Sequence, residues 1–365
     1  MDDKLVNQGE TSSRGGTVKN LAAFGLAIAM LVAALICGVS LGTENFSFQE
    51  VVAAIFTSQD EEELSISSTI IREIRLPRVL LAALCGGLLA AAGAVFQGFF
   101  RNPLADSGIM GISSGAAFGA VSSAMLPAGL AALPIFASIN YLFSDFATPI
   151  FAFAGAFLVA ITVFASSHLQ GRYSSTTVII LTGTAASAFF SALTSLLVLM
   201  KDKELYKMFV WTLGSFNGKG WNELQFILPM TIISVVLLWF CPKPLDLLAG
   251  GEASAQSLGL NLAATKVLVL GTGSLAAATA VCAGGTIGFV GLIVPHLLRR
   301  LYSPRHSLLI PASILWGGVF LVVADLISRT AIAPAEIPVG LVTSLAGAPF
   351  FVFLLLAGGE KNYEV

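Results

Sequence analysis

The stretch VLLAALCGGLLAAAGAVFQGF, residues 79–99, decides the fold class of this chain. It contains no charged side chain and is about 20 residues long, which is what an α-helix needs to cross the hydrocarbon layer of a bilayer. It also lacks the alternation of apolar and polar residues that marks a strand of a membrane barrel. The stretch therefore predicts a membrane-spanning helix.

Runs of the same kind recur along the whole chain. The 365 residues are 56% hydrophobic and only 11% charged, whereas soluble domains carry about 25% charged residues. We predict an all-α integral membrane protein with about ten transmembrane helices. The expected spans are 21–41, 79–99, 108–133, 147–167, 177–200, 224–241, 263–284, 287–301, 308–327 and 337–357.

The two ends of the chain are expected on the cytoplasmic side. Residues 1–20 are polar and contain Gly15-Gly16, so we predict a disordered cytoplasmic tail. The run 21–41 is too long for a typical signal peptide and is read as an uncleaved first span. Lys and Arg are slightly more frequent in the segments on the side of the N-terminus, which is the cytoplasmic side by the positive-inside rule. Residues 21–360 then form a single transmembrane domain.

One predicted span is broken by Gly and Pro. The segment 284–296 contains Gly288, Gly291 and Pro295, and ends at His296. A helix interrupted in this way is tolerated at membrane depth only where protein or a cavity covers it. With only three His in the chain, all well separated, a metal site is not predicted and His296 is read as structural.

Several function classes are disfavoured by what the spans lack. Ion-coupled carriers usually place ionisable side chains in the membrane, but the predicted spans contain almost none. Asp325 lies near a span end, four residues before Arg329, and an ion pair at the membrane surface explains both. No HExxH motif and no paired carboxylates at helical spacing within a span are found, so the chain is not predicted to be an enzyme. The chain also lacks a P-loop, so another chain would have to bind ATP. The net charge of −2 suggests no affinity for nucleic acid.

Three local motifs stand out, and the first and the last have both a structural and a functional interpretation. Arg75 and Arg78, in the string RLPR, are either interfacial arginines or a docking site for an acidic partner outside the membrane. Asn102-Pro103 is a turn signal before the third span. In the inner loop 243–262, Pro244 and Gly250 bound one short predicted helix, and a second runs from Glu252 to Leu258 and ends at Gly259. This loop is either an amphipathic surface segment or an element that inserts into a groove of an ATPase.

Small hydroxyl side chains gather on one face of the fifth span. Their spacing of three or four residues places them together on a helix. They either form hydrogen bonds between helices or line an uncharged translocation path. The path candidates are Thr184, Ser187, Ser191, with Thr194 and Ser195 beside them, and more weakly Thr343 and Ser344 on the last span.

Five motifs in a fixed order resemble the FecCD family, permeases of type II ABC importers that take up ferric siderophores, haem and cobalamin. The strings are RLPR (75–78), GFFRNPLADSGIMGISSGA (98–116), LLAGGEASAQSLGL (247–260), GTIGFVGLIVPHLLRR (285–300) and EIPVGLVTSLAGAPFFVFLL (336–355). The resemblance covers roughly residues 45–360. One departure is Ser107, where many members carry Pro, and we expect it to loosen the turn into the third span.

The resemblance implies a permease domain that works inside a larger assembly in a bacterial or archaeal inner membrane. Its implied partners are a second copy of the chain, two ATPase subunits that hold ATP and Mg on the cytoplasmic side, and an extracytoplasmic substrate-binding protein. It implies no cofactor on this chain. Arg75, Arg78 and Arg329 would meet acidic residues of the binding protein. The residues that would couple to the ATPase are Glu252, Ala253, Ser257, Leu258, Gly259 and Leu260.

The substrate is expected to be a ferric siderophore. This follows from the segment 210–216, VWTLGSF, which resembles the same segment in iron-chelate members. Haem and cobalamin are the alternatives. Two other classes stay open from the residues alone, namely an ion-coupled secondary carrier and a membrane scaffold or receptor subunit that transports nothing.

Overall fold

The computed structural model describes residues 3–56, 66–123, 140–166, 175–200 and 205–358, and within these ranges all regular structure is helical. The helices are α1 (Asp3–Ser40), α2 (Phe48–Phe56), α3 (Ile66–Thr69), η1 (Ile70–Arg75), α4 (Leu76–Phe100), η2 (Ser107–Met110), α5 (Ile112–Ser123), α8 (Asn140–Ser166), α9 (Ser175–Leu199), α10 (Leu205–Thr212), α11 (Trp221–Leu238), α12 (Pro242–Leu248), α13 (Glu252–Ser257), α14 (Leu262–Gly284), α15 (Val290–Leu301), α16 (His306–Thr330) and α17 (Val339–Gly358).

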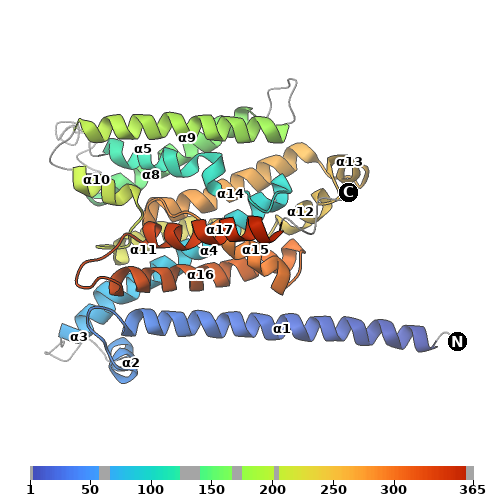
Figure 1. Ribbon diagram of the computed structural model, residues 1–365, viewed down its shortest axis with the longest axis horizontal. Coiled ribbons are helices and arrows are strands. Elements are labelled where there is room, and N and C mark those ends of the chain that lie inside the picture. Colours follow the sequence, from blue (N-terminus) through green and yellow to red (C-terminus); the bar gives the residue numbers. More distant parts are fainter. Residues whose placement is uncertain (1–2, 57–65, 124–139, 167–174, 201–204, 359–365) are drawn as a thin grey trace.

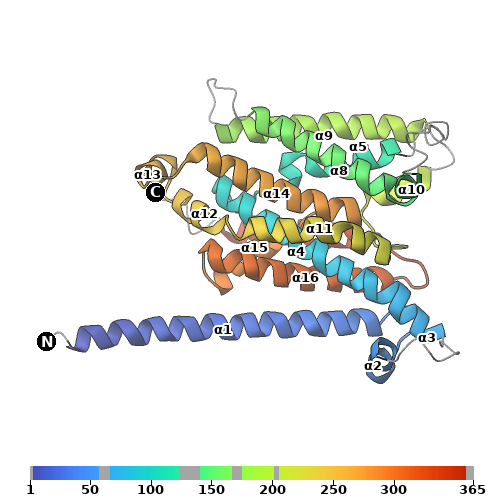
Figure 2. The same cartoon turned by 180° about the vertical axis from the view of Figure 1, so that it is seen from behind.

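The long helices run side by side along one direction, as a transmembrane bundle requires (Figure 1). The short helices α12 and α13 lie at one end of this bundle, which we call the loop end. The opposite end, where α2 and α3 lie, also holds Arg75, Arg78 and Arg329, and we call it the arginine end. Seen from behind, α1 lies at the edge of the bundle, next to α16 (Figure 2).

Seven of the described helices are long and apolar enough to cross a membrane, and each coincides with a predicted span. The other three predicted spans correspond to shorter helices. Of 108–133, the structure describes η2 and α5, which end at Ser123, and the rest lies outside the described residues. The broken span is the 12-residue helix α15, and the last span is α17. The prediction of an all-helical membrane protein is confirmed.

The first helix differs from the prediction. Helix α1 begins at Asp3, so the backbone of most of the predicted disordered tail is helical and continuous with the first span. Once a helix has been nucleated by an apolar span, each further residue adds one backbone hydrogen bond at low cost. Gly15-Gly16 does not interrupt it.

Helix α4 lies at the centre of the bundle and contacts α14, α15 and α16. Glycines make this packing close. A methyl group added to Gly86 would overlap the carbonyl oxygen of Gly317 on α16, and one added to Gly93 would overlap that of Gly291 on α15. Transmembrane helices associate through this kind of close contact between small residues. The small residues of 79–99 therefore serve packing as well as insertion into the membrane.

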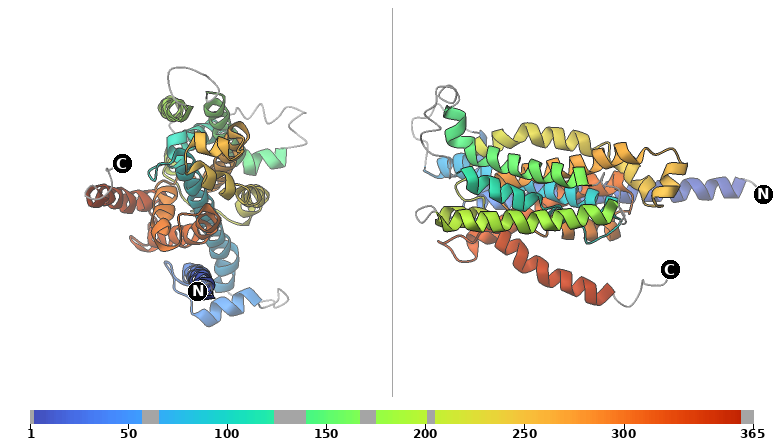
Figure 3. Two further views of the ribbon diagram at one scale, coloured as in Figure 1. Left: turned by 90° about the vertical axis from the view of Figure 1, so that its right-hand side faces the viewer. Right: turned by 90° about the horizontal axis from the view of Figure 1, so that it is seen from above.

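Helix α17 diverges from the rest of the bundle, as the view from above shows (Figure 3). Between it, α15 and α16 lies an apolar groove of about 380 Å³. The groove is lined by side chains such as Leu297, Trp316 and Phe320.

Candidate functional site

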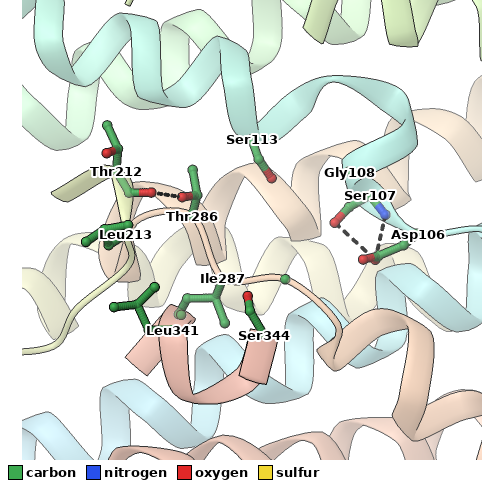
Figure 4. A pocket seen from close by; sticks show the side chains of 12 residues that line it. Asp106, Ser107, Gly108, Ser113, Thr212, Leu213, Thr286, Ile287, Leu341 and Ser344 are labelled. Carbon is green, nitrogen blue, oxygen red and sulfur yellow. Dashed lines mark hydrogen bonds between the residues drawn. The ribbon is translucent and has the colours of Figure 1, made fainter. Parts of the chain in front are cut away.

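A cavity of about 280 Å³ with both polar and apolar lining lies among the spans, where four separate segments meet. They are the turn before α5, the end of α10, the break between α14 and α15, and the start of α17. Ser113 of α5 and Ser344 of α17 point toward the cavity from opposite sides (Figure 4). The lining residues are Asp106, Ser107, Gly108, Ser113, Thr212, Leu213, Thr286, Ile287, Gly288, Gly340, Leu341 and Ser344.

The irregular backbone around the cavity is satisfied by hydrogen bonds between the segments. The Ser215 N–H donates to the Gly284 carbonyl at 2.8 Å, and the Gly340 N–H donates to the Gly214 carbonyl at 3.2 Å. The Thr286 hydroxyl donates to the Thr212 carbonyl. Unpaired backbone groups are too costly at membrane depth. These bonds therefore let the broken helix exist there, as the Gly and Pro pattern predicted.

Gly214 and Gly285 are required at this crossing. Both have positive φ angles, +73° and +75°, which side chains rarely adopt. A methyl group on Gly214 would also overlap the Thr286 carbonyl oxygen, and one on Gly285 would overlap that of Trp211. The path prediction omitted these glycines, although Gly214 lies in the segment 210–216 from which the substrate was inferred.

Asp106 contributes the carboxylate of the cavity. Its Oδ1 accepts the Ser107 N–H at 2.7 Å and lies within 3.3 Å of the Ser107 hydroxyl, so that it caps the short helix η2. Proline at position 107 could not donate this backbone bond. The expectation that Ser107 loosens the turn is therefore corrected, because Ser107 adds a bond to it.

The cavity contains one of the predicted path residues, Ser344. Thr343 is buried, donates to the Gly340 carbonyl at 3.1 Å and lines the apolar groove instead. On α9, Thr184 and Ser191 are exposed and Ser187 is half-buried beside Gly111. Ser113, Thr212 and Thr286 line the cavity but were missed. Their hydroxyls lie singly on different segments, so no periodic pattern in the sequence marks them.

The predicted inner loop forms two short helices, α12 and α13. Gly250 and Gly251 separate them, and Gly259 follows α13 with a φ of +85°. On α12, Leu245 and Leu248 are buried, and on α13 Ala255 is buried. Leu258 is 68% exposed. Among the predicted coupling residues, Ala253, Ser257, Leu258 and Gly259 are exposed, while Glu252 and Leu260 are half-buried.

The remaining motif residues shape the turn after α4 and the helix α15. Asn102 accepts the Leu104 N–H at 2.9 Å, which forms the turn around Pro103. Pro295 is buried within α15, and His296 has a buried Nε2 that finds no hydrogen-bond partner among the described residues. Gly288 has open space where a side chain would be. In the first turn of α15, the Gly291 carbonyl accepts the Gln97 side-chain N–H at 3.1 Å.

Arg78 and Arg329 are buried and paired inside the protein. Each is only 5% exposed. Arg78 donates to Asp325 Oδ1 from Nε at 3.0 Å and from its terminal nitrogen at 2.9 Å, and it also donates to Glu336. Arg329 lies 3.1 Å from Asp325 Oδ2 and donates to the Gly38 carbonyl at 2.8 Å. The predicted pair of Asp325 and Arg329 is confirmed, but it is buried rather than at the surface.

Arg75 is also 5% exposed and binds the end of α1. It donates to the carbonyls of Val39 at 2.9 Å, Ser40 at 3.1 Å and Glu44 at 2.5 Å, and its guanidinium stacks over Phe46 at 4.6 Å. Cations are favourable at the C-terminal end of a helix. The expectation that the three arginines present their charges to an outside partner is therefore revised, because all three side chains are buried and have acceptors within the chain.

Among the described residues, the side chains around the cavity can form hydrogen bonds with a molecule that enters it. No three His, Cys, Asp or Glu residues gather there into a possible metal site. The four cysteines are free, and Cys85, Cys241 and Cys282 are buried. The cavity combines hydroxyl groups, backbone groups and one carboxylate with the apolar side chains of Leu213, Ile287 and Leu341. Such a surface can hydrogen-bond a passing polar molecule.

Comparison with known proteins gives consistent matches over most of the chain. The model of the FecCD transport family matches residues 30–357. The cobalamin import system permease protein BtuC of Halobacterium salinarum is 40% identical, covering 79% of this chain and 74% of its own. The Fe(3+) dicitrate permease protein FecD of Escherichia coli is 37% identical, covering 79% and 85%.

A solved structure supports the same assignment. It is described as an inward-facing conformation of a metal-chelate type ABC transporter, and it is 31% identical with a TM-score of 0.75. The match covers 92% of this chain and 99% of that one. The family model and the relatives at this level of identity settle the classification, and the chain belongs to the FecCD transport family of membrane permeases.

Proposed function

We propose that this permease subunit carries a ferric siderophore or a similar iron chelate across the cytoplasmic membrane of a bacterium or archaeon. The observation that carries the proposal is the cavity with hydroxyl groups in its wall among the spans, together with the exposed two-helix loop at one end of the same bundle. Transport is by alternating access, and a separate ATPase subunit drives it because this chain has no P-loop. The chain itself performs no covalent chemistry.

The proposed assembly follows from the two ends of the bundle. Two ATPase subunits contact the loop end on the cytoplasmic side, where both termini lie, and hold ATP and Mg. The substrate-binding protein contacts the arginine end from outside. The arginines stabilise that face from within, and Glu336, whose side chain is 24% exposed, belongs to its surface. No cofactor is assigned to this chain.

A second copy of the chain would complete the path. Only 22% of the apolar membrane-spanning stretch of α9 is buried within the subunit. The exposed face of this helix carries Thr184, Ser191 and Ser195 among apolar residues. In a homodimer, this face would lie across the path from its equivalent. The cavity, with Ser344 in its lining, then forms the wall of the path in each subunit. Small hydroxyl groups suit a bulky cargo that must not bind tightly.

Cobalamin is the second candidate. The 40% identity to a cobalamin permease is slightly higher than the 37% to the dicitrate permease, so overall identity does not favour iron. The segment 210–216, which contributes Thr212 and Leu213 to the cavity wall, is the specific argument for an iron chelate. Haem is a third candidate.

The deciding experiment is uptake into proteoliposomes that contain the full complex with its ATPase and binding protein. Labelled ferric siderophore, haem and cobalamin would be offered separately, with and without ATP. We expect ATP-dependent and binding-protein-dependent uptake of the ferric siderophore. Uptake of cobalamin alone would make cobalamin the substrate in place of the ferric siderophore. Uptake that follows an ion gradient without ATP would refute the proposal of an ATP-driven importer.

A further inference from the structure

The loop end contains a partly buried polar contact that ties the inner loop to the transmembrane bundle. Asp246 lies on α12, and His306 is the first residue of α16. One carboxylate oxygen of Asp246, Oδ1, lies 2.9 Å from the His306 backbone nitrogen and 2.7 Å from His306 Nδ1. The two residues are far apart in sequence, so this contact joins two separate elements.

Asp246 caps a helix that its own sequence leaves uncapped. The N-cap residue of α16 is Arg305, whose side chain makes no capping hydrogen bond. The first N–H groups of a helix have no partner within it, and a negative charge there is favourable. The carboxylate that satisfies the first N–H of α16 comes from α12 instead. Any displacement of α12 therefore acts directly on the end of α16.

The His306 ring fixes this contact against α4. The side chain is 4% exposed, and its Nε2 lies so close to Gly98 that a methyl group there would overlap the ring. Because the Asp246 carboxylate can only accept a hydrogen bond, His306 Nδ1 carries the proton and donates it to Asp246 Oδ1. Helix α12 also contacts α4 and α16. The inner loop thus packs against both helices, and the Asp246–His306 contact joins it to the first residue of α16.

The two central helices then connect the ends of the bundle. Helix α16 has 25 residues, which at 1.5 Å per residue is about 37 Å. It carries His306 at the loop end and Asp325, the partner of Arg78 on α4, at the arginine end. Between these points, α4 and α16 pack closely, with Gly86 against the backbone of Gly317.

We infer that Asp246 and His306 form the joint through which the inner loop moves α16 and α4 when the ATPase subunits close. The inference rests on the proposed function. In it, α12 and α13 receive the movement, the joint passes it to α16, and the arginine end moves with that helix. Both residues are positioning residues, because neither contacts cargo or ATP.

The test compares Asp246→Ala and Asp246→Asn with the control Arg305→Gln, which removes a charge beside the joint without touching it. In proteoliposomes with the full complex, uptake of labelled ferric siderophore and ATP hydrolysis are measured together. We expect the ATP hydrolysis rate of Asp246→Ala to stay within about twofold of that of the unmodified complex. The amount of substrate taken up per ATP hydrolysed should fall on the order of tenfold, because the variant loses a charged hydrogen bond. Asp246→Asn, which keeps an acceptor oxygen, should lie between, and Arg305→Gln should match the unmodified chain.

A second measurement uses the chain alone in detergent and does not depend on transport. Amide hydrogen exchange at the start of α16 should rise in Asp246→Ala and stay unchanged in Arg305→Gln. Unchanged uptake per ATP in Asp246→Ala would overturn the joint and leave the importer intact. Equal losses of hydrolysis and uptake would also overturn it, since they indicate lost ATPase binding. Failure of the unmodified complex to take up any chelate with ATP would overturn the proposed function, and the joint with it.

Discussion

Removal of the Asp325 carboxylate should be among the most destabilising single changes at the arginine end. Asp325 is 1% exposed and is shared by Arg78 and Arg329. Removing one partner of a buried ion pair costs about 3–5 kcal/mol, because a charge is left uncompensated. Arg78 keeps Glu336 at 3.0 Å, and Arg329 keeps the Gly38 carbonyl at 2.8 Å. We therefore expect Asp325→Ala to cost about 3 kcal/mol, at the low end of that range.

The assay is thermal unfolding in detergent, followed by tryptophan fluorescence. At roughly 2 °C per kcal/mol for a chain of this size, Asp325→Ala should lower Tm by about 6 °C. The matched control is Glu336→Gln, which removes a carboxylate that is partly exposed and should cost about 1 kcal/mol. The double variant Asp325→Ala/Arg329→Leu should recover stability, since it removes the uncompensated charge as well. If the double variant is no more stable than Asp325→Ala, the argument from a stranded charge is refuted.

Three further predictions concern packing, coupling and the path. Gly86→Ala should destabilise the bundle by about 1–3 kcal/mol, because its methyl group would overlap Gly317. The control Gly25→Ala has open space around the added methyl group and should leave Tm unchanged in the same melting assay. Leu258→Asp places a charge on an exposed apolar side chain of the inner loop and should reduce co-purification of the ATPase without changing Tm; normal co-purification would contradict the coupling role. Ser344→Trp should fill much of the 280 Å³ cavity and abolish uptake while the chain still assembles, and full uptake would place the path elsewhere.

The sequence predicts the spans well because membrane insertion depends on a single local quantity, the length of an apolar run. Helices such as α9 and α14 begin within two residues of their predicted starts. The two short helices of the inner loop were also predicted, because Pro and Gly mark their ends locally. Helix α1 was predicted too short, since a polar composition does not prevent a helix from extending beyond its span.

The roles of side chains were harder to predict, because they depend on contacts between distant segments. The string RLPR shows two charges near a membrane surface. Their partners lie far away in sequence, namely the carbonyls at the end of α1 for Arg75 and the carboxylates of Asp325 and Glu336 for Arg78. The cavity is another example. Thr212 and Thr286 come from different segments and meet only in the fold. Only Ser344, at the start of a predicted span, was identified in advance.

Helix α4 shows why one apolar stretch can carry so much of the structure. Gly86 admits α16, Gly93 admits α15, and Gly98 admits the His306 ring. Each glycine removes a side chain where another backbone or ring must approach, and Arg78 at the start of the same helix closes the arginine end. The residues that insert α4 into the membrane are thus the residues that hold its neighbours in register. A larger side chain at any of these three glycines would separate a pair of helices and weaken the connection between the two ends of the bundle.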